Sequence, residues 1–396
     1  MIALTVALVV AGVPLSASAA SLGGISLASF TRASLTADGA TLTVSWDAVP
    51  GATGYDVFAS TSYSGVPAQT VPAARTASTT ATLTGLTPNT DYFVQVRATS
   101  PGHVGPRSNR VGHGTIAAEL SSTSAASGTT HRVLSWNVCS VKCAKFATRK
   151  KVIDRRFTEL SAGIIGLQEA SKYKKAPAGF AFAYNGQNDI LYRKSLYTAV
   201  TNGTLRAKGS VTFARKHGAT GKGVSWAALR SRTTGRFVVV FDVHLKSGTS
   251  AAETAQREYE ASRIQPYVEQ IYRWLNARFA ATTTWSAAPA IVLGDVNTNK
   301  SRTGDDTQRV LESAGWYDAF DQARSLSGQH RNTANPKKKT TPVIGMTWGD
   351  HVDKVLVQPS RAVVLGWSSA GKMARGKYVS PLGSDHHPLL VVLTVA

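Results

Sequence analysis

The pattern of apolar and polar positions changes near residue 118 of this chain. Before that point, short runs of alternating apolar and polar residues are separated by Pro, Gly and Asn, as in the strands of a β-sandwich. These runs cover residues 41–46, 54–59, 79–83 and 92–98. Trp46 and Tyr55 are the large residues that we expect in the core of this sandwich.

After residue 130 the apolar runs become continuous, which is typical of strands that are buried on both faces. Helical patterns occur between them, so we expect an α/β domain. The expected strands cover residues 132–138, 163–169, 189–192, 226–229, 237–243, 291–294, 352–357, 362–365 and 389–395. Helices are expected over residues 147–160 and 251–278, the second bent or broken by Pro266. Residues 118–130, rich in Ser, Thr and Ala, have the composition of a linker.

One strand of the second part ends in a polar motif. The run Ile-Val-Leu-Gly is followed directly by Asp295, Val296 and Asn297. Residues two apart in extended backbone point to the same side, so Asp295 and Asn297 can act on one ligand. An Asx-rich turn after a core strand is the alternative explanation of this motif alone.

Other predicted strands of this domain also border polar residues. Each alone has an ordinary explanation: a lone His is more often a core residue, and an Asn, Asp or Glu can end a strand or cap a helix. Together they predict one rim where several strand ends converge, the place where α/β proteins build sites. The candidate residues are Asn137, Glu169, His244, Asp295, Asn297, Asp353, Asp385 and His386.

Charge is concentrated in the second part of the chain. The 396 residues carry a net charge of +21, although residues 1–117 hold only five Arg against four Asp. Such a field attracts polyanions: nucleic acid, anionic lipid or an acidic wall polymer. A charged content of 17% beside a hydrophobic content of 43% indicates a globular rather than a disordered chain.

The N-terminus indicates export, and export bears on how the two cysteines are interpreted. Residues 1–20 form an apolar run that ends in Ala-Ser-Ala, the pattern of a cleavable signal peptide, with an uncleaved membrane anchor as the alternative. No other stretch is predicted to span a membrane. We therefore expect a secreted protein, and a monomer. In that setting Cys139 and Cys143 favour a disulfide over a metal site or a redox pair, because a second ligand pair and a Cys-x-x-Cys spacing are both missing.

The first part resembles a fibronectin type III domain. Besides the strand pattern, the stretch Leu-Thr-Pro-Asn-Thr-Asp-Tyr that ends at Tyr92 is similar to a tyrosine corner. This resemblance covers residues 21–117. The segment has no cluster of His, Asp or Glu, so it is expected to serve as a spacer or to bind a surface polymer. Deleting it is expected to leave hydrolysis of a soluble substrate unchanged.

The second part resembles the endonuclease/exonuclease/phosphatase superfamily, which has the deoxyribonuclease I-like fold. The matching motifs are Ser-Trp-Asn137, Gly-Leu-Gln-Glu169, Asp-Val-His244-Leu, Gly-Asp295-Val-Asn297, His-Val-Asp353-Lys and Ser-Asp385-His386-His-Pro. They span nearly all of residues 131–396. The resemblance implies a four-layer α/β sandwich, in which two packed mixed β-sheets are flanked by helices.

The resemblance also implies roles for these residues. Glu169 is the expected ligand of Mg²⁺, with Asn137 and Asp385 close to the ion or its waters; Mn²⁺ is an alternative, and a need for Ca²⁺ stays open. His386, oriented by Asp353, would be the general base or acid.

The remaining roles complete an in-line hydrolysis of a P–O bond without a covalent intermediate. Asp295 would position or deprotonate the attacking water, and Asn297 would donate to a phosphate oxygen. His244 would bind and protonate on the opposite side, oriented by Asn188 or Asp189.

Two departures from the family pattern stand out. Cys139 replaces an acidic residue that the abasic-site nucleases of the family have two positions after the motif Asn, which favours one metal over two. His351 and Val352 precede Asp353 where relatives frequently have Arg.

The basic loops favour a nucleic acid as the substrate, because a phosphate backbone binds rows of Lys and Arg. Lys174, Arg215 and Lys338 represent three such loops. We therefore predict a nuclease of low sequence specificity. The alternatives are a phosphomonoesterase, a sphingomyelinase-like phosphodiesterase, which should show an apolar hairpin that this sequence lacks, and a non-catalytic surface-binding protein.

Overall fold

The computed structural model describes residues 21–117, 128–218, 221–279, 285–335, 340–345 and 347–395. The predicted signal peptide, residues 118–127 of the predicted linker and Lys338 lie outside this part. In the part that is described, no helix is long and apolar enough to cross a membrane.

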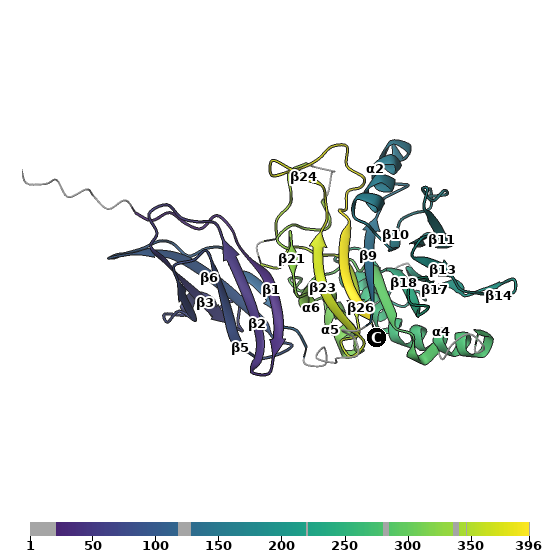
Figure 1. Ribbon diagram of the computed structural model, residues 1–396, viewed down its shortest axis with the longest axis horizontal. Coiled ribbons are helices and arrows are strands. Elements are labelled where there is room, and N and C mark those ends of the chain that lie inside the picture. Colours follow the sequence, from purple (N-terminus) through teal and green to yellow (C-terminus); the bar gives the residue numbers. More distant parts are fainter. Residues whose placement is uncertain are drawn as a thin grey trace, which may run out of the picture.

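The N-terminal part is the expected β-sandwich (Figure 1). One sheet contains β1 (Ala28–Thr36), β2 (Gly39–Trp46) and β5 (Thr80–Leu86). The other contains β3 (Gly54–Ser60), β4 (Ala74–Thr76), β6 (Asp91–Ser100), β7 (His103–Val104) and β8 (Val111–Gly114), and a 3₁₀ turn, η1 (Val66–Ala68), follows β3. Trp46 and Tyr55 pack edge to face in the core, and the Thr87 N–H donates to the Tyr92 hydroxyl at 3.1 Å. That hydrogen bond is the tyrosine corner that the sequence predicts.

The second part consists of two packed mixed sheets. The first has the order β11 (Phe180–Tyr184), β12 (Asp189–Arg193), β10 (Ile164–Gln168), β9 (Thr129–Asn137), β26 (Leu389–Val395), β23 (Ala362–Ser369) and β21 (Leu326–Ser327). The second has the order β13 (Tyr197–Ala199), β17 (Gly223–Ser231), β18 (Phe237–His244), β19 (Ala290–Asp295), β22 (Asp353–Val357) and β20 (Tyr317–Asp318), with β16 (Lys208–Thr212) also paired to β17. Two short hairpins complete the strands: β14 (Thr201–Asn202) with β15 (Leu205–Arg206), and β24 (Met373–Ala374) with β25 (Lys377–Tyr378).

Helices cover the outer faces of these sheets, which gives the expected four layers. Between the sheets, side chains such as Ile164 and Leu293 form one buried core. Helix α2 (Phe146–Glu159) packs Ile153 on the outer face of the first sheet. On the second sheet, α4 (Ile264–Phe279) packs Leu275. The other helical segments are α3 (Ala251–Ser262), α5 (Thr307–Ser313), α6 (Ala319–Gln322) and the 3₁₀ turn η3 (Trp285–Ala287).

Two boundaries refine the sequence analysis. The long predicted helix is broken between Ser262 and Ile264, so that Pro266 lies in the first turn of α4, where its missing N–H costs nothing. Residues 129 and 130, assigned to the linker from the sequence, already pair with Val395 and Thr394 of β26. Amino-acid composition could not locate this boundary, because threonine is common in linkers and in strands.

Candidate active site

The polar strand ends meet at one rim of the two sheets. Asn137 ends β9, His244 ends β18 and Asp295 ends β19, while Glu169 follows β10 directly. Asp353 begins its strand, but β22 runs antiparallel to β19 and pairs Asp353 with Asp295. Antiparallel pairing therefore brings a strand start to the same rim as its neighbour's end.

The backbone before Asp295 is shaped by a glycine. Gly294 has a φ of +150°, and a Cβ added to it would lie 1.9 Å from the carbonyl oxygen of Val243 in β18. Since no side chain fits there, Gly294 lets β19 approach β18 closely at the rim. The approach brings the Asp295 carboxylate to 3.7 Å from Nε2 of His244.

Asp295 lies at the centre of the site. Its Oδ2 accepts a hydrogen bond from Asn137 Nδ2 at 2.9 Å, which joins the two sheets, and lies 4.0 Å from His386 Nε2. Its Oδ1 accepts the Asn297 N–H at 3.0 Å. Burial raises the pKa of Asp295, and the two histidines act in the opposite direction. Asp295 is thus placed to hold or accept a proton between His244 and His386.

His386 is hydrogen-bonded to Asp353. The distance from His386 Nδ1 to Asp353 Oδ2 is 2.8 Å, and the Asp353 side chain is fully buried. Burial alone would lower the pKa of His386, but Asp353, Asp295 and Asp385 raise it to about 10. The ring therefore carries a proton at neutral pH, which fits a general acid or a phosphate-binding cation and disfavours the role of base.

His244 has the opposite character. Its side chain is 7% exposed, and burial lowers the pKa to about 4, although Asp295 partly opposes the shift. His244 is therefore neutral at pH 7 and suits a proton acceptor, so its expected role as a proton donor is not supported by its surroundings. Neither predicted orienting residue is hydrogen-bonded to it: Asn188 donates to the carbonyl of Gly223, and Asp189 accepts from the N–H of Gly186.

These pKa values predict a wide pH range of activity. The reaction needs a protonated His386, an ionised Asp295 and a neutral His244. On the alkaline side, kcat/KM should therefore fall above about pH 10, where His386 loses its proton. On the acid side, it should fall at the pKa of Asp295 or of His244, whichever is higher. A pH–rate profile from pH 4 to 10.5 checks this. An alkaline limb near pH 7, the ordinary range of histidine, would contradict the role given to Asp353.

Asn297 lies where the sequence predicts, at the edge of the same cluster. Its φ of +55° turns the chain after β19, and its Nδ2 donates to the carbonyl of Leu245 at 3.0 Å. An amide nitrogen carries two N–H groups, so the second can donate to a phosphate oxygen.

Each of the three predicted metal ligands makes its own contacts at the rim. The Glu169 side chain is 22% exposed, and its nearest cation is Lys142 at 3.9 Å. Asn137 Oδ1 accepts the Cys139 N–H at 3.0 Å, and Ser384 Oγ donates to Asp385 at 3.0 Å. The two carboxylates and the amide oxygen are the donor types that Mg²⁺ prefers, so the residues present fit this ion chemically.

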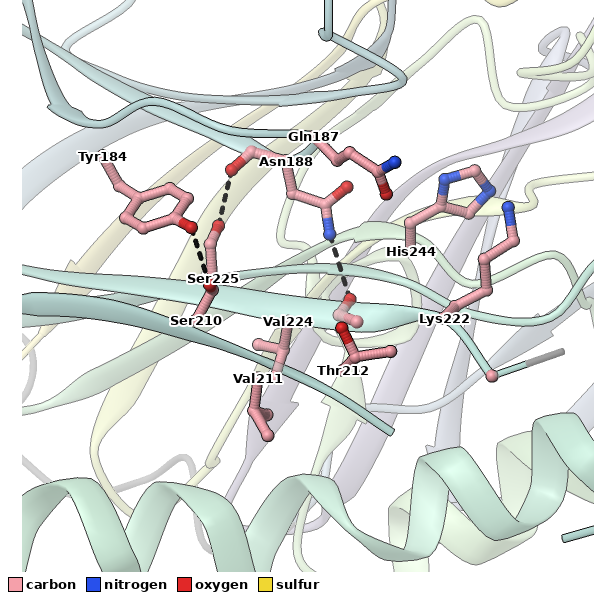
Figure 2. A pocket seen from close by; sticks show the side chains of 12 residues that line it. Tyr184, Gln187, Asn188, Ser210, Val211, Thr212, Lys222, Val224, Ser225 and His244 are labelled. Carbon is pink, nitrogen blue, oxygen red and sulfur yellow. Dashed lines mark hydrogen bonds between the residues drawn. The ribbon is translucent and has the colours of Figure 1, made fainter. Parts of the chain in front are cut away.

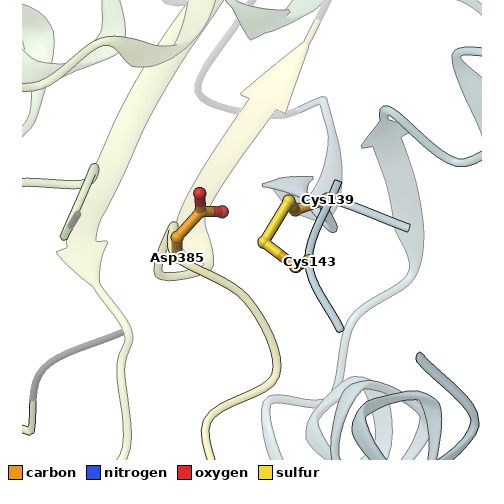
Figure 3. A group of neighbouring side chains, drawn as sticks. All are labelled: Cys139, Cys143 and Asp385. Atoms are coloured by element: carbon orange, nitrogen blue, oxygen red, sulfur yellow. A yellow bond between two sulfur atoms is a disulfide. The ribbon is translucent and has the colours of Figure 1, made fainter. Parts of the chain in front are cut away.

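The Cys139–Cys143 disulfide is present, as the sequence predicts. Figure 3 shows the Asp385 carboxylate facing it. These three residues form no metal site, because disulfide sulfurs are not thiolate ligands. The disulfide closes the loop after β9, where Cys139 itself has a φ of +44°.

A pocket of about 220 Å³ opens beside His244 (Figure 2). Lys222 and His244 lie at one end of it, and Tyr184 with Ser210 at the other. Burial lowers the pKa of Lys222, against the attraction of Glu169 and Asp295. Lys222 belongs to the basic stretch that Arg215 represents in the sequence analysis, and the structure brings it beside His244.

The weaker substrate-binding predictions have mixed outcomes. Lys174 and Arg215 are exposed, and Arg215 donates to the carbonyl of Gly218 at 2.8 Å. Neither is recorded in the pocket beside His244. His351 is a core residue: it packs on Phe320 and Trp367, and its Nε2 bonds to the carbonyl of Gln329.

Comparisons with known proteins agree with this architecture. No curated protein matches the sequence. A mannosyl-6-phosphatase of Bacteroides thetaiotaomicron has a similar structure, with 18% identity, coverage of 67% of this chain and 99% of its own, and a TM-score of 0.50. An endonuclease/exonuclease/phosphatase family protein of the same species has 18% identity, covers 68% of this chain and 99% of its own, and has a TM-score of 0.49. The TDP2 protein of D. rerio, complexed with a single-strand DNA product, has 15% identity, covers 67% of this chain and 100% of its own, and has a TM-score of 0.47. Residues 30–113 match the fibronectin type III domain model, and the remainder has the fold of the endonuclease/exonuclease/phosphatase proteins.

Proposed function

We propose that this protein is a secreted, Mg²⁺-dependent phosphodiesterase that cleaves nucleic acid with little sequence preference. The observation that carries the proposal is the position of Asp295 between a neutral His244 and a protonated His386. A proton acceptor and a proton donor that both approach Oδ2 of one carboxylate suit hydrolysis of a phosphate ester. The disulfide supports an extracellular setting.

The chain's own groups would divide the reaction as follows. Asp295, with His244 beside it, takes a proton from the water that attacks phosphorus. His386 gives its proton to the oxygen whose bond to phosphorus breaks, and Asp353 stabilises the charged ring. Asn297 donates to a non-bridging phosphate oxygen. A Mg²⁺ ion held by Glu169, with Asn137 and Asp385 nearby, supplies charge neutralisation on the phosphate when it is bound.

Lysines at the rim support a polyanionic substrate. Lys222 lines the pocket beside His244, and Lys142 lies 3.9 Å from Glu169. The backbone N–H groups of Lys222 and Lys246 both donate to the buried Glu260 of α3, which fixes their two loops against the site. Such a row of cations can follow a phosphate backbone on both sides of the cleaved bond.

A charge change at Lys222 should act on substrate binding. Lys222→Met is expected to raise KM about tenfold and to flatten the dependence of KM on salt, because one phosphate contact is lost. The matched control is Lys216→Met, in the same loop but exposed and absent from the pocket. Steady-state kinetics at two salt concentrations check this; equal KM values for the two variants would contradict it.

Removal of the metal should stop the reaction. EDTA is expected to lower turnover by about a thousandfold or more, and Mg²⁺ to restore it, because the phosphate charge is otherwise left without a cation. Full activity in EDTA would show that the reaction does not require Mg²⁺.

A second candidate function comes from the pocket beside His244. Its volume of about 220 Å³ and its polar lining, with Asn188, Ser210 and Thr212, suit a single small group attached to a phosphate. A phosphomonoesterase or an enzyme for a small phosphodiester would use this pocket. Rates on supercoiled DNA, RNA, a nitrophenyl phosphodiester and a nitrophenyl phosphomonoester separate these functions, and silence on all four would favour a binding protein.

A further inference from the structure

The fibronectin type III domain is joined to the second domain by backbone hydrogen bonds as well as side chains. In Figure 1, β1 lies beside β21, and β8 of the same domain contacts α6. The Ala33 N–H donates to the carbonyl of Arg324 at 3.2 Å, and the Gly112 N–H donates to that of Thr347 at 2.9 Å. Bonds of this kind fix both position and orientation, which a flexible spacer does not need.

The centre of this interface resembles a protein core. His113 of β8 is fully buried, with its ring 5.5 Å from that of Phe30 and 4.7 Å from that of Phe320 in α6. Burial lowers the pKa of His113, so the ring packs there as a neutral group. Interfaces between mobile domains are usually more polar, so this one indicates a fixed arrangement.

One lysine, whose side chain is 16% exposed, connects the interface to the rim. Nζ of Lys300 lies 2.8 Å from Asp91 of the fibronectin domain and 2.6 Å from Asp321 of α6. Burial alone would lower the pKa of Lys300, but the two carboxylates raise it above its ordinary value. A charge held this way depends on its partners, because one left unpaired inside a protein is costly.

Lys300 belongs to the loop that follows β19 and carries Asn297. Within this loop, Arg302 donates to the Asn297 carbonyl at 2.5 Å, and Asn299 donates to the carbonyl of Gly349 at 2.9 Å. Asn297 has a left-handed φ of +55°, a conformation that Asn tolerates better than most other residues, and the hydrogen bonds of this loop hold it there. Asp91 thus holds the loop from outside the catalytic domain.

We propose that the fibronectin type III domain is part of the catalytic unit: the ion pair between Asp91 and Lys300 fixes the loop that positions Asn297 at the phosphate. Asp91 and Lys300 are positioning residues, and they act through Asn297. The kinetic part of this inference rests on the proposed function, whereas the ordering of the loop does not.

Deletion of residues 21–117 is then expected to impair hydrolysis of a soluble substrate, whereas the sequence alone predicts no change. Deletion would expose Lys300, Asp321 and Phe320 together, so a truncated protein would lose stability for reasons unrelated to Asn297. The test therefore uses the full chain with a single charge removed. Asp91→Asn keeps the size of the side chain, and the Asp91 side chain is 43% exposed, so the fold should survive.

The first readout is hydrogen exchange, which needs no activity. In Asp91→Asn, the amides of residues 296–302 are expected to exchange about tenfold faster than in the parent protein. The control is Asp38→Asn, an exposed acid between β1 and β2 of the same domain. Unchanged exchange at these amides would overturn the proposal whatever the protein hydrolyses.

The second readout uses the phosphate ester that the protein cleaves. Asp91→Asn is expected to lower kcat about tenfold while KM stays within about twofold, because Asn297 acts mainly on the transition state. The double variant Asp91→Asn/Asn297→Ala should then be no slower than Asn297→Ala alone. Multiplied effects would mean that Asp91 acts independently of Asn297, and would overturn the proposal. A protein with no hydrolytic activity would fail the proposed function, and the exchange data alone would decide this inference.

Discussion

His386→Ala is expected to lower kcat by about three orders of magnitude while leaving the fold intact. The size follows from the loss of a positioned proton donor, which usually contributes a factor of about 10² to 10⁴. Nδ1 of the ring lies 2.8 Å from Asp353 Oδ2, and the His386 side chain is only 14% exposed, so the orientation of the ring at the rim is fixed. Alanine leaves Asp353 buried without its partner, so a modest fall in thermal stability should accompany the loss.

The control for this variant is His103→Ala. His103 is an exposed histidine in β7 of the fibronectin domain, far along the chain from the rim. Both variants are compared by kcat and by melting temperature. Near-normal turnover by His386→Ala would remove His386 from the reaction, and with it the assignment of the site.

Asp295→Asn should have an effect of similar size, about a thousandfold on kcat, for a different reason. Asparagine keeps the volume of the side chain but removes the charge that faces His244 at 3.7 Å and His386 at 4.0 Å. The substitution also replaces the charged oxygen that accepts the hydrogen bond of Asn137 Nδ2 by a neutral amide group, which weakens this bond. Proton transfer from water and support of the imidazolium are both weakened.

The Asp295 variant has a second measurable consequence. Since Asp295 contributes to the raised pKa of His386, its loss should move the alkaline limb of the pH–rate profile to lower pH. Asp306→Asn is the matched control, because Asp306 is exposed and pairs only at the surface with Arg309. A profile unchanged in shape and height would contradict the central position given to Asp295.

The convergence of polar strand ends at one rim could be predicted because the evidence for each strand end was local. Asn137, His244 and Asp295 each close a continuous apolar strand, and a strand that stops at a polar residue is visible in the sequence. Asp353 was identified as well, although the sequence did not show that antiparallel pairing with β19 brings it to the rim.

Other features depended on distances that the sequence does not contain. Lys222 is one cation among many in a basic loop, and only folding brings it beside His244. Asp91 and Lys300 are 209 positions apart, so their ion pair has no sequence signature. The opposite pKa shifts of His244 and His386 likewise arise from burial and from neighbouring carboxylates, which no motif encodes.

The ligand roles of Glu169, Asn137 and Asp385 stay predictions. The structure places these residues around the rim, with Glu169 half-buried after β10 and Asp385 beside the disulfide. Titration of Mg²⁺ into the parent protein and into Glu169→Gln, followed by calorimetry, would test them without any substrate.

Cleavage of supercoiled plasmid is measured for the purified protein with Mg²⁺, beside His386→Ala under the same conditions. Nicking by the parent protein alone is the predicted result, and it would identify a nuclease whose reaction depends on His386. Nicking by both proteins would place the reaction elsewhere, and activity on small phosphate esters without any nicking would contradict nucleic acid as the substrate.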